Sequence, residues 1–283
     1  MNQTLEKENK KVLIKGNYAI AQAAIIAGCE CYFGYPITPQ TEVAAYMSKR
    51  LPKIDGGVFL QAESEIAAIN MVIGVSSTGK RVMTSSSSPG ISLKSEGLSY
   101  LAGCDLPALV VNVQRGGPGL GGIQPSQSDY FQATRGGGHG DYHMIVLAPD
   151  SVQEMVSLTF KGFDLADQYR MTTMILADGT MGQMMEPVSL DMGEVKKYDK
   201  PWALTGTKGE RKPNIVNSLF LKPDELEVFN IDRYKKYKIV EENEVMYEEY
   251  MTEDADICIV AFGVAARVSK NAIDEARKNG IKV

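Results

Sequence analysis

Short apolar runs alternate with longer stretches of helical periodicity from about residue 11 to residue 180. The apolar runs are rich in β-branched and aromatic residues and predict strands at 31–35, 58–61, 81–85, 108–113, 144–147 and 173–177. Apolar residues at helical spacing predict helices between them, at 18–27, 40–50, 64–76, 91–102 and 152–168. Nearly continuous apolar strands are typical of sheets covered on both faces. The pattern therefore predicts an α/β fold with a doubly wound, mostly parallel sheet.

The alternation stops near residue 190. Residues 191–254 are polar and contain three prolines, which predicts a linker with short helices or a hairpin. Beyond it, residues 256–261 predict a strand, residues 264–279 a helix, and residues 280–283 the start of another strand. We therefore predict an α/β domain over 1–190, a linker over 191–254, and the beginning of a second α/β domain over 255–283, truncated within its second strand.

Composition and charge exclude several classes of protein. The chain has 283 residues, of which 44% are hydrophobic, enough for a sizeable core. The net charge of −5 gives no basic field of the kind that nucleic acid or an anionic membrane attracts. No apolar run approaches the roughly 20 residues of a membrane-spanning helix, and the polar N-terminal segment does not have the pattern of a signal peptide. We expect a cytoplasmic protein.

Several short motifs lack the context that their chemistry requires. Residues 74–80 come one residue short of a phosphate-binding P-loop, and they close a predicted helix where a P-loop would open one. Residues 117–122 match G-x-G-x-x-G without a helix to follow, which favours a flexible loop over a cleft. His139 and His143 have no further ligand nearby, so no metal is expected, and four scattered cysteines do not have the spacing of an iron–sulfur cluster.

Polar side chains gather where the predicted strands end and the helices begin, the region that binds ligands in doubly wound sheets. Four segments qualify: 35–39, 61–65, 85–90 and 114–117. Together they offer carboxylates, hydroxyls and one guanidinium, without a strong nucleophile or a set of metal ligands. This combination suits an organic cofactor that supplies its own reactive carbon.

The first of these segments, YPITP, is unusually stiff. Pro36 and Pro39 fix their own φ angles and push the residues before them, Tyr35 and Thr38, into extended conformations. Pro39 suits the first position of a helix, which makes Thr38 the predicted N-cap. Two interpretations stay open at this point: Thr38 only caps a helix, or the stiffness holds residues 35–38 against a substrate.

The segments YPITPQTE, QAESEIAAINMVIG, TSSSSPGISL and NVQRGGPG resemble the α-type subunit of 2-oxoacid:ferredoxin oxidoreductases. The resemblance covers nearly the whole chain and is greatest to the branched-chain (3-methyl-2-oxobutanoate) and 2-oxoglutarate members. It implies that residues 1–190 form the pyrimidine-binding domain of the thiamine diphosphate fold. It also implies oxidation of a 2-oxoacid to an acyl-CoA, with coenzyme A as a substrate, iron–sulfur clusters as electron carriers and ferredoxin as the acceptor.

The resemblance also implies roles for individual residues. Glu65 aligns with the glutamate that hydrogen-bonds the aminopyrimidine ring and promotes proton transfer from the thiazolium carbon, Thr38 with a substrate-contacting threonine, and Arg115 with the arginine that meets the substrate carboxylate. Tyr35 is expected beside the substrate, and Pro36, Ser87 and Ser88 beside the cofactor. From the residues alone, alternatives stay open: Glu63 or Glu65 is a first-turn acid that favours the helix dipole, and Arg115 is an exposed arginine at a strand end.

One departure from the family pattern matters. Thiamine enzymes hold the diphosphate and Mg²⁺ through a G-D-G…N motif, and the nearest match here is Ala177-Asp178-Gly179. The resemblance therefore implies a β-type partner with the diphosphate half and Mg²⁺, and a small subunit that carries iron–sulfur clusters. 3-Methyl-2-oxobutanoate is the favoured substrate, with 2-oxoglutarate or pyruvate as alternatives. The other alternative is a non-catalytic nucleotide-binding or scaffolding subunit, which the near-miss glycine motifs would suit.

Overall fold

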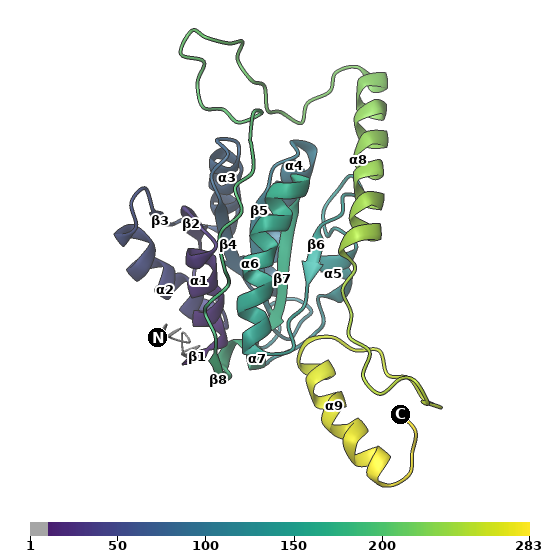
Figure 1. Cartoon of the computed structure of the whole chain (residues 1–283). Helices are drawn as coiled ribbons and strands as arrows, with labels where there is room; N and C mark the ends of the chain where they lie inside the picture. Colours follow the sequence, from purple (N-terminus) through teal and green to yellow (C-terminus); the bar gives the residue numbers. More distant parts are fainter. Residues whose placement is uncertain (1–10) are drawn as a thin grey trace, which may run out of the picture.

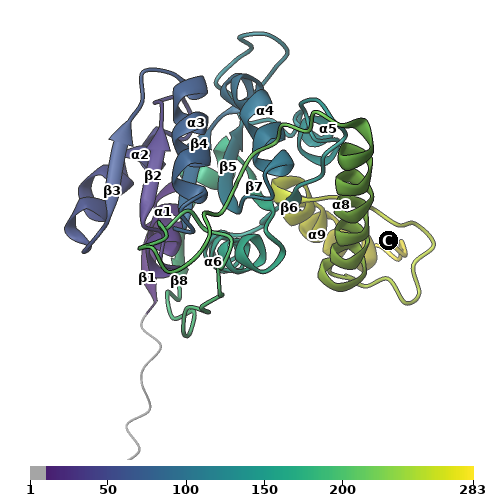
Figure 2. The same cartoon turned by 90° about the horizontal axis from the view of Figure 1, so that it is seen from above.

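The centre of the molecule is a six-stranded parallel sheet with the strand order β3-β2-β4-β5-β7-β6, seen in the computed structural model, which describes residues 11–283 (Figures 1 and 2). The strands are β2 (Cys31–Gly34), β3 (Val58–Gln61), β4 (Val82–Ser86), β5 (Ala108–Gln114), β6 (Ile145–Leu147) and β7 (Thr172–Asp178). All six predicted strands are present within one residue at each end. The prediction of a doubly wound parallel sheet is confirmed.

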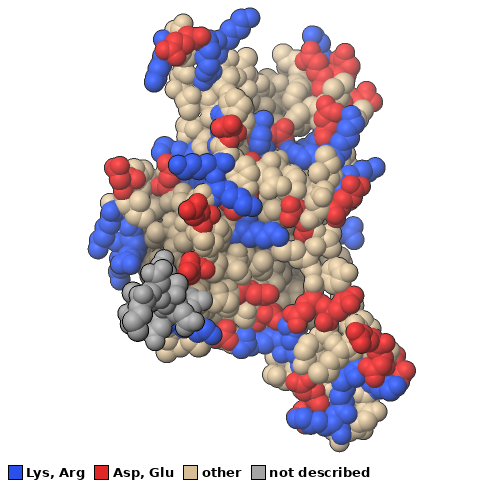
Figure 3. Space-filling model, viewed as in Figure 1, with Lys and Arg blue, Asp and Glu red and all other residues tan. Residues whose placement is uncertain are grey.

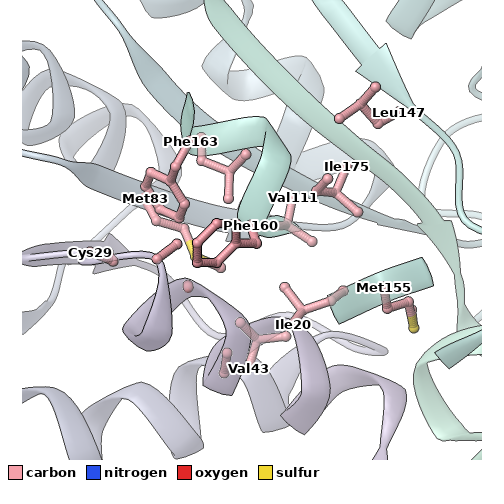
Figure 4. Close-up of a cluster of buried hydrophobic side chains, with 14 of the residues drawn as sticks. Ile20, Cys29, Val43, Met83, Val111, Leu147, Met155, Phe160, Phe163 and Ile175 are labelled. Atoms are coloured by element: carbon pink, nitrogen blue, oxygen red, sulfur yellow. The ribbon is translucent and has the colours of Figure 1, made fainter. Parts of the chain in front are cut away.

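Helices cover both faces of the sheet. One face packs against α1 (Gly16–Ile26), α2 (Thr41–Arg50) and α6 (Val152–Tyr169), and the other packs against α3 (Glu65–Ser76) and α4 (Ser88–Gly103). Each strand supplies both cores, because successive side chains point to opposite faces. On β5, for example, Val111 packs with α1 and α6, and Val110 packs with α3 and α4. Figure 4 shows Val111 and Ile175 facing Ile20 and Phe160 in the first of these cores.

Several short elements escape the sequence prediction. β1 (Val12–Lys15) and β8 (Met185–Val188) form an antiparallel two-stranded ribbon outside the main sheet. The other short elements are η1 (Leu51–Lys53), α5 (Tyr130–Thr134) and α7 (Gly179–Gln183). Elements of three to five residues carry too little periodicity to be recognised, and β8 contains a proline, which argues against a strand.

The segment after β8 crosses the body without regular structure until α8 (Pro223–Glu244). A buried ion cluster fastens its first part: Arg81 pairs with Asp164 at 2.7 Å and with Asp167 at 2.8 Å, and Lys200 from the segment pairs with Asp167 at 2.5 Å. Arg81 also donates to the Lys196 carbonyl at 3.2 Å. The predicted short helices or hairpin of this region are one long helix, which stands at one side of the body (Figures 1 and 2).

The C-terminal part contains α9 (Gly263–Lys278), close to the predicted helix. The predicted strands at 256–261 and 280–283 are wrong: neither stretch pairs in a ladder, and Val260 is 95% exposed. The amides of Asp256 and Ile257 donate to the Lys282 carbonyl, but no further strand lies beside them in the part of the chain that is described. A strand needs a neighbour to satisfy its backbone, so apolar alternation alone was insufficient here. The division into domains stays a prediction.

Ion pairs hold α9 against the body. Arg267 pairs with Glu186, and Lys270 pairs with Asp150 at 2.8 Å. Charged side chains of both signs are mixed over this region and over the edge of α8 (Figure 3). Within residues 11–283, no helix is both long enough and apolar enough to cross a bilayer.

Candidate functional site

The predicted ligand-binding segments meet at the carboxyl edge of the sheet, where β2, β3, β4 and β5 end. Arg115, directly after β5, donates from Nη1 to the carbonyl of Thr38, which follows β2, at 3.1 Å. The amide of Arg115 donates to Oγ of Ser88, after β4, at 3.0 Å. Glu65, after β3, lies against Gly90 in the first turn of α4. Four stretches that are distant in sequence therefore form one site.

Glu65 is placed by the start of α3. Ser64 is the N-cap, and its hydroxyl accepts from the amide of Ala67 at 3.1 Å, so the helix begins at Glu65. The Glu65 side chain is buried, with 6% of its surface exposed. Glu63 precedes the cap and is exposed. Glu65 is a first-turn acid, as one interpretation expected, but its burial sets it apart from a solvated helix start.

Gly90 leaves the space that the Glu65 carboxylate occupies. A Cβ at this position would lie 2.9 Å from Oε1 of Glu65 and would overlap Oγ of Ser86. Glycine is therefore required by the close approach of two side chains to the α4 backbone. The result is a carboxylate that lies over the first turn of a helix at the sheet edge.

The serine run 85–88 divides into two kinds of hydroxyl. Ser88 is engaged: it donates to Asp129 at 2.5 Å and accepts from the Arg115 amide, so it ties α4 to β5 and to the following loop. Ser86 and Ser87 are fully buried, and their Oγ atoms have no hydrogen-bond partner within the described residues. Unpaired buried hydroxyls are costly in a folded protein, so their hydrogen-bonding capacity beside Glu65 is notable.

Arg115 is buried, with 7% of its surface exposed, so the interpretation of an exposed strand-end arginine is wrong. Its guanidinium bridges two loops: Nη1 donates to Thr38 and Nη2 to the carbonyl of Leu120, each at 3.1 Å. Nε has no hydrogen-bond partner in the described part of the chain. A guanidinium carries five N–H donors, so unused donors remain at the point where the two loops meet.

The second of these loops, 116–122, is the glycine-rich motif. It folds back on itself, with the Gly122 amide donating to the Gly116 carbonyl at 2.9 Å. Gly121 has a φ of +59°, and a Cβ there would overlap the Gly116 carbonyl. No helix opens at Gly122, so this stretch is a loop, as predicted, and its flexibility over a cleft stays a prediction. The other motif, 74–80, ends α3 at Ser76 as predicted.

The stiff segment 35–39 is not held by a helix cap at Thr38, as predicted, but by buried side chains next to it. α2 begins at Thr41 with Gln40 as its N-cap, so the prediction that Thr38 caps the helix is wrong. The reason is that Gln40 is fully buried: Oε1 accepts from Ser85 at 2.5 Å and Nε2 donates to the Tyr35 carbonyl at 3.3 Å. Asn17 of α1 also donates to the Pro39 carbonyl at 2.8 Å. The side chain of Thr38 is left exposed at the sheet edge.

Tyr35 and Pro36 are exposed in the same segment, and 37% of the tyrosine surface is accessible. The predicted substrate-side residues therefore present their side chains outward from a backbone that is fixed by Gln40, Asn17 and Arg115. The interpretation that the stiffness is positional fits this geometry.

Sequence reasoning missed the buried polar residues that support the site. Gln40 and Asn17 fix the first segment, Asp129 accepts from Ser88 and Asn112, and Lys94 lies in α4 below Gly90. One signal was present for Lys94, because it lies three residues after Ile91 and four before Leu98, on the apolar face of a predicted helix. A polar residue on such a face requires an explanation.

Burial changes the electrostatics of two of these groups. Burial lowers the pKa of Lys94 from 10.5 to about 8, and the nearby Glu65 partly offsets this effect. Burial raises the pKa of Asp178, at the end of β7. The Asp178 carboxylate accepts from the amides of Thr180 at 2.8 Å and Met181 at 3.1 Å, so it caps α7. In the Ala177-Asp178-Gly179 stretch, the aspartate therefore acts as the N-cap of α7.

The two histidines pack in aromatic contacts away from the sheet edge. The His143 ring stacks on Tyr237 with centroids 4.8 Å apart, and the His139 ring meets Tyr100 edge-on at 6.1 Å. Within residues 11–283, no group of three or more His, Cys, Asp or Glu side chains is arranged to hold a metal ion.

Comparisons with known proteins give the family. Residues 22–252 match the family described as "Pyruvate flavodoxin/ferredoxin oxidoreductase, thiamine diP-bdg". The ketoisovalerate oxidoreductase subunit VorB of Methanothermobacter marburgensis is 55% identical over 272 residues, covering 96% of this chain and 77% of the relative. The 2-oxoglutarate synthase subunit KorA of the same organism is 37% identical over 302 residues, covering 96% and 80%.

A solved structure has a similar fold. The 2-oxoglutarate:ferredoxin oxidoreductase from Magnetococcus marinus, with 2-oxoglutarate, coenzyme A and succinyl-CoA bound, matches with a TM-score of 0.86 and 33% identity. The match covers 97% of this chain and 53% of the solved one. The chain therefore spans about half the length of that protein.

Proposed function

The chain belongs to the thiamine diphosphate-binding family of pyruvate flavodoxin/ferredoxin oxidoreductases, and on that premise we propose that it is the α-type subunit of a branched-chain 2-oxoacid oxidoreductase. The reaction is the oxidation of 3-methyl-2-oxobutanoate to an acyl-CoA, with ferredoxin as the electron acceptor. Higher identity to the ketoisovalerate subunit than to the 2-oxoglutarate subunit supports this substrate over 2-oxoglutarate.

The observation that carries the proposal is the Glu65 carboxylate. It is buried at the sheet edge, against a glycine backbone, and makes no hydrogen bond to another side chain within the described residues. A buried carboxylate without a hydrogen-bond donor is unfavourable, and an aminopyrimidine ring offers it that hydrogen bond. The unpaired hydroxyls of Ser86 and Ser87 beside it offer further contacts to a polar ring. The residues present therefore fit the pyrimidine end of thiamine diphosphate.

When bound, thiamine diphosphate supplies the carbon nucleophile that adds to the 2-oxo group and accepts the electron pair left by the departing carbon dioxide. The role of Glu65 is to hold the aminopyrimidine ring and to share a proton with its ring nitrogen. Pro36, which is exposed after β2, and Ser87 and Ser88, which are buried after β4, would complete the contacts to the ring.

Arg115, Thr38 and Tyr35 form the substrate side of the proposed site. The unused N–H donors of Arg115 suit a carboxylate, and a charge-assisted contact with a guanidinium is among the stronger ones. Arg115 also fixes the Thr38 carbonyl, so the exposed Thr38 hydroxyl is held at a set position beside it. The Tyr35 side chain extends the same surface toward the alkyl end of the substrate.

Partner subunits complete the proposed enzyme. Asp178 is used as a helix cap, so we assign the diphosphate and Mg²⁺ to a β-type partner, and the iron–sulfur clusters to a small further subunit that passes electrons to ferredoxin. Exposed apolar side chains near the site support a partner at this edge: Ile66 is 50% exposed, Leu93 50% and Leu120 82%.

The test is reconstitution with the partner subunits, followed by assay of CoA-dependent reduction of a low-potential dye with a panel of 2-oxoacids. Glu65→Gln is expected to lower kcat by about 10²–10⁴-fold, because a positioned proton-transfer group contributes about that much. Glu63→Gln is the matched control, since Glu63 is exposed two residues earlier, and it is expected to retain activity. Full activity of the Glu65 variant would contradict the assigned role.

A further inference from the structure

Lys94 is a buried cation whose presence the proposed chemistry does not explain. Its side chain is 0% exposed, and Nζ has no hydrogen-bond partner within the described residues. Lysine is almost never fully buried unless it is paired, because removing an ammonium group from water is costly. A fold that keeps such a residue inside α4 needs a compensating interaction or a function for it.

The packing of α4 on α3 places Lys94 behind Glu65. Gly90 of α4 lies against Glu65, and a Cβ at Gly97 of α4 would lie 2.5 Å from Ile69 of α3. Residues four apart on a helix share a face, so Lys94 follows Gly90 by one turn on the face that α3 covers. Lys94 thus lies between the Gly90–Glu65 contact and the Gly97–Ile69 contact.

We propose that Lys94 is a positioning residue for Glu65, whose buried ammonium keeps the negative charge on the Glu65 carboxylate and so prepares it for the aminopyrimidine ring. The inference rests on the proposed function for its catalytic consequence, but the electrostatic attraction between the two groups concerns this chain alone. The field of Glu65 favours the charged form of Lys94. An ammonium one helix turn from Gly90 also attracts the carboxylate that lies against Gly90.

The other ionisable groups on or against α4 have different partners. Glu96 accepts from Tyr100 on the exposed face of the helix, at 2.8 Å. Asp129 accepts from Ser88 and Asn112 at the start of the helix. Burial raises the pKa of Tyr142 to about 12, so it is neutral near pH 8. Glu65 is therefore the charged group that acts on Lys94 among the described residues.

The pairing is tested without any activity measurement. In a chain labelled with ¹³C at the lysine ε-carbon, the Lys94 signal is assigned by its loss in Lys94→Met and followed against pH by NMR. Lys94 is expected to titrate near pH 8, and in Glu65→Gln its pKa is expected to fall further, because the favourable carboxylate is lost. An unchanged titration in Glu65→Gln would overturn the pairing.

The consequence for the reaction is tested in the reconstituted enzyme. Lys94→Met is close in length and apolar, so it is expected to fold with a raised Tm while kcat falls about tenfold or more, part of the roughly 10²–10⁴-fold that proton-transfer groups supply. In the pH profile of kcat, the fall in activity on the acidic side is expected to occur at higher pH in Lys94→Met than in the wild type. Lys94→Arg is expected to restore the wild-type profile. Lys235→Met, with an exposed lysine of α8, is the matched control.

The outcomes separate this inference from the proposed function. A normal kcat and pH profile in Lys94→Met would overturn the positioning role, even if Glu65→Gln were inactive. If Glu65→Gln kept full activity, the proposed function of Glu65 would fail, whereas the NMR titration would still decide whether the two groups are paired. A double variant that loses no more activity than Glu65→Gln alone is expected, since Lys94 acts through Glu65.

Discussion

The helices α4 and α8 differ in composition and have opposite environments. Neither has a clean apolar stripe, but α4 buries eight of its 16 residues, whereas α8 buries two of its 22, Arg233 and Tyr237. α4 packs against both α3 and the sheet, and α8 stands at the side of the body with apolar residues such as Val228 exposed (Figure 2). The environment of each helix is set by what packs against it.

The difference identifies where this chain holds its chemistry. Small residues let α4 approach its neighbours, since Gly90 admits Glu65 and Gly97 admits Ile69. That close approach fixes the carboxylate and buries Lys94 behind it. α8 has no such contacts, and an apolar surface left open on a helix is typical of a region that other protein surfaces cover. Substitutions in α4 should therefore disturb the site and the core, and substitutions at exposed positions of α8 should not.

Gly90→Ala should give the largest effect. The new Cβ would overlap Oγ of Ser86 and lie 2.9 Å from Oε1 of Glu65, so the carboxylate must move. A displacement of about 1 Å at a reacting group costs about 10²-fold in rate, and we expect at least this loss of kcat in the reconstituted enzyme.

The matched control for Gly90→Ala is Gly74→Ala in α3, where a Cβ would have nothing within 4 Å. That variant should keep its activity and gain about 0.5–1 kcal/mol in free energy of unfolding, because alanine favours a helix over glycine. Equal behaviour of the two variants would refute the close-approach explanation.

Leu98→Ala in α4 and Val228→Ala in α8 compare the two helices directly. Leu98 is 2% exposed, and its truncation should lower the free energy of unfolding by about 2–5 kcal/mol through the cavity it leaves. Val228 is 59% exposed, and its truncation should change stability by no more than about 0.5 kcal/mol. Urea unfolding of the two variants measures the difference; similar losses would show that α8 is held more firmly than its exposure indicates.

The pH dependence of stability tests the charge on Lys94 itself. The pKa of Lys94 is about 8 in the folded chain against an ordinary 10.5, so between these values the unfolded chain binds more protons. Stability from this group therefore rises with pH over that range, by on the order of 3–4 kcal/mol at about 1.4 kcal/mol per pH unit.

Tyrosines with raised pKa values, such as Tyr32, oppose this rise, because their acid form is favoured in the folded chain. The measurement is therefore the difference in free energy of unfolding between wild type and Lys94→Met across pH 7 to 10.5. That difference should favour Lys94→Met most strongly at pH 7 and shrink as the pH rises. A difference independent of pH would mean that the folded chain does not deprotonate Lys94 in this range, so that the free-energy cost of burying the ammonium stays constant.

The sheet could be predicted from sequence because parallel, doubly covered strands such as β5 and β7 are long and continuously apolar. Residues 256–261 carry a similar pattern and form no strand, because pairing depends on a neighbour that local sequence does not reveal. The ribbon of β1 and β8 joins residues that are far apart in the chain, and a four-residue strand with a proline gives no signal of it.

The candidate site was predictable to a different degree. Glu65, Thr38 and Arg115 stand out at strand ends because the carboxyl edge of a parallel sheet is a fixed place. The role of Gln40 could not be read, since its burial results from contacts with Ser85 and the Tyr35 carbonyl on other segments. Local sequence favours Thr38 as the cap, whereas the hydrogen bond from Ser85 fixes Gln40, two residues later, as the cap of a helix that begins at Thr41.

The ribbon of β1 and β8 brings together the two ends of the part of the chain that contains the main sheet. Val12 pairs with Val188, so the backbone enters and leaves the sheet-bearing part at adjacent positions of one ladder. In a chain limited to residues 12–188, a short peptide joining these two points, with new ends at the exposed turn of Asp55 and Gly56, would keep every strand pairing of the main sheet. A circularly permuted chain is thus compatible with this architecture. Its new ends would lie between α2 and β3, where another protein can be fused.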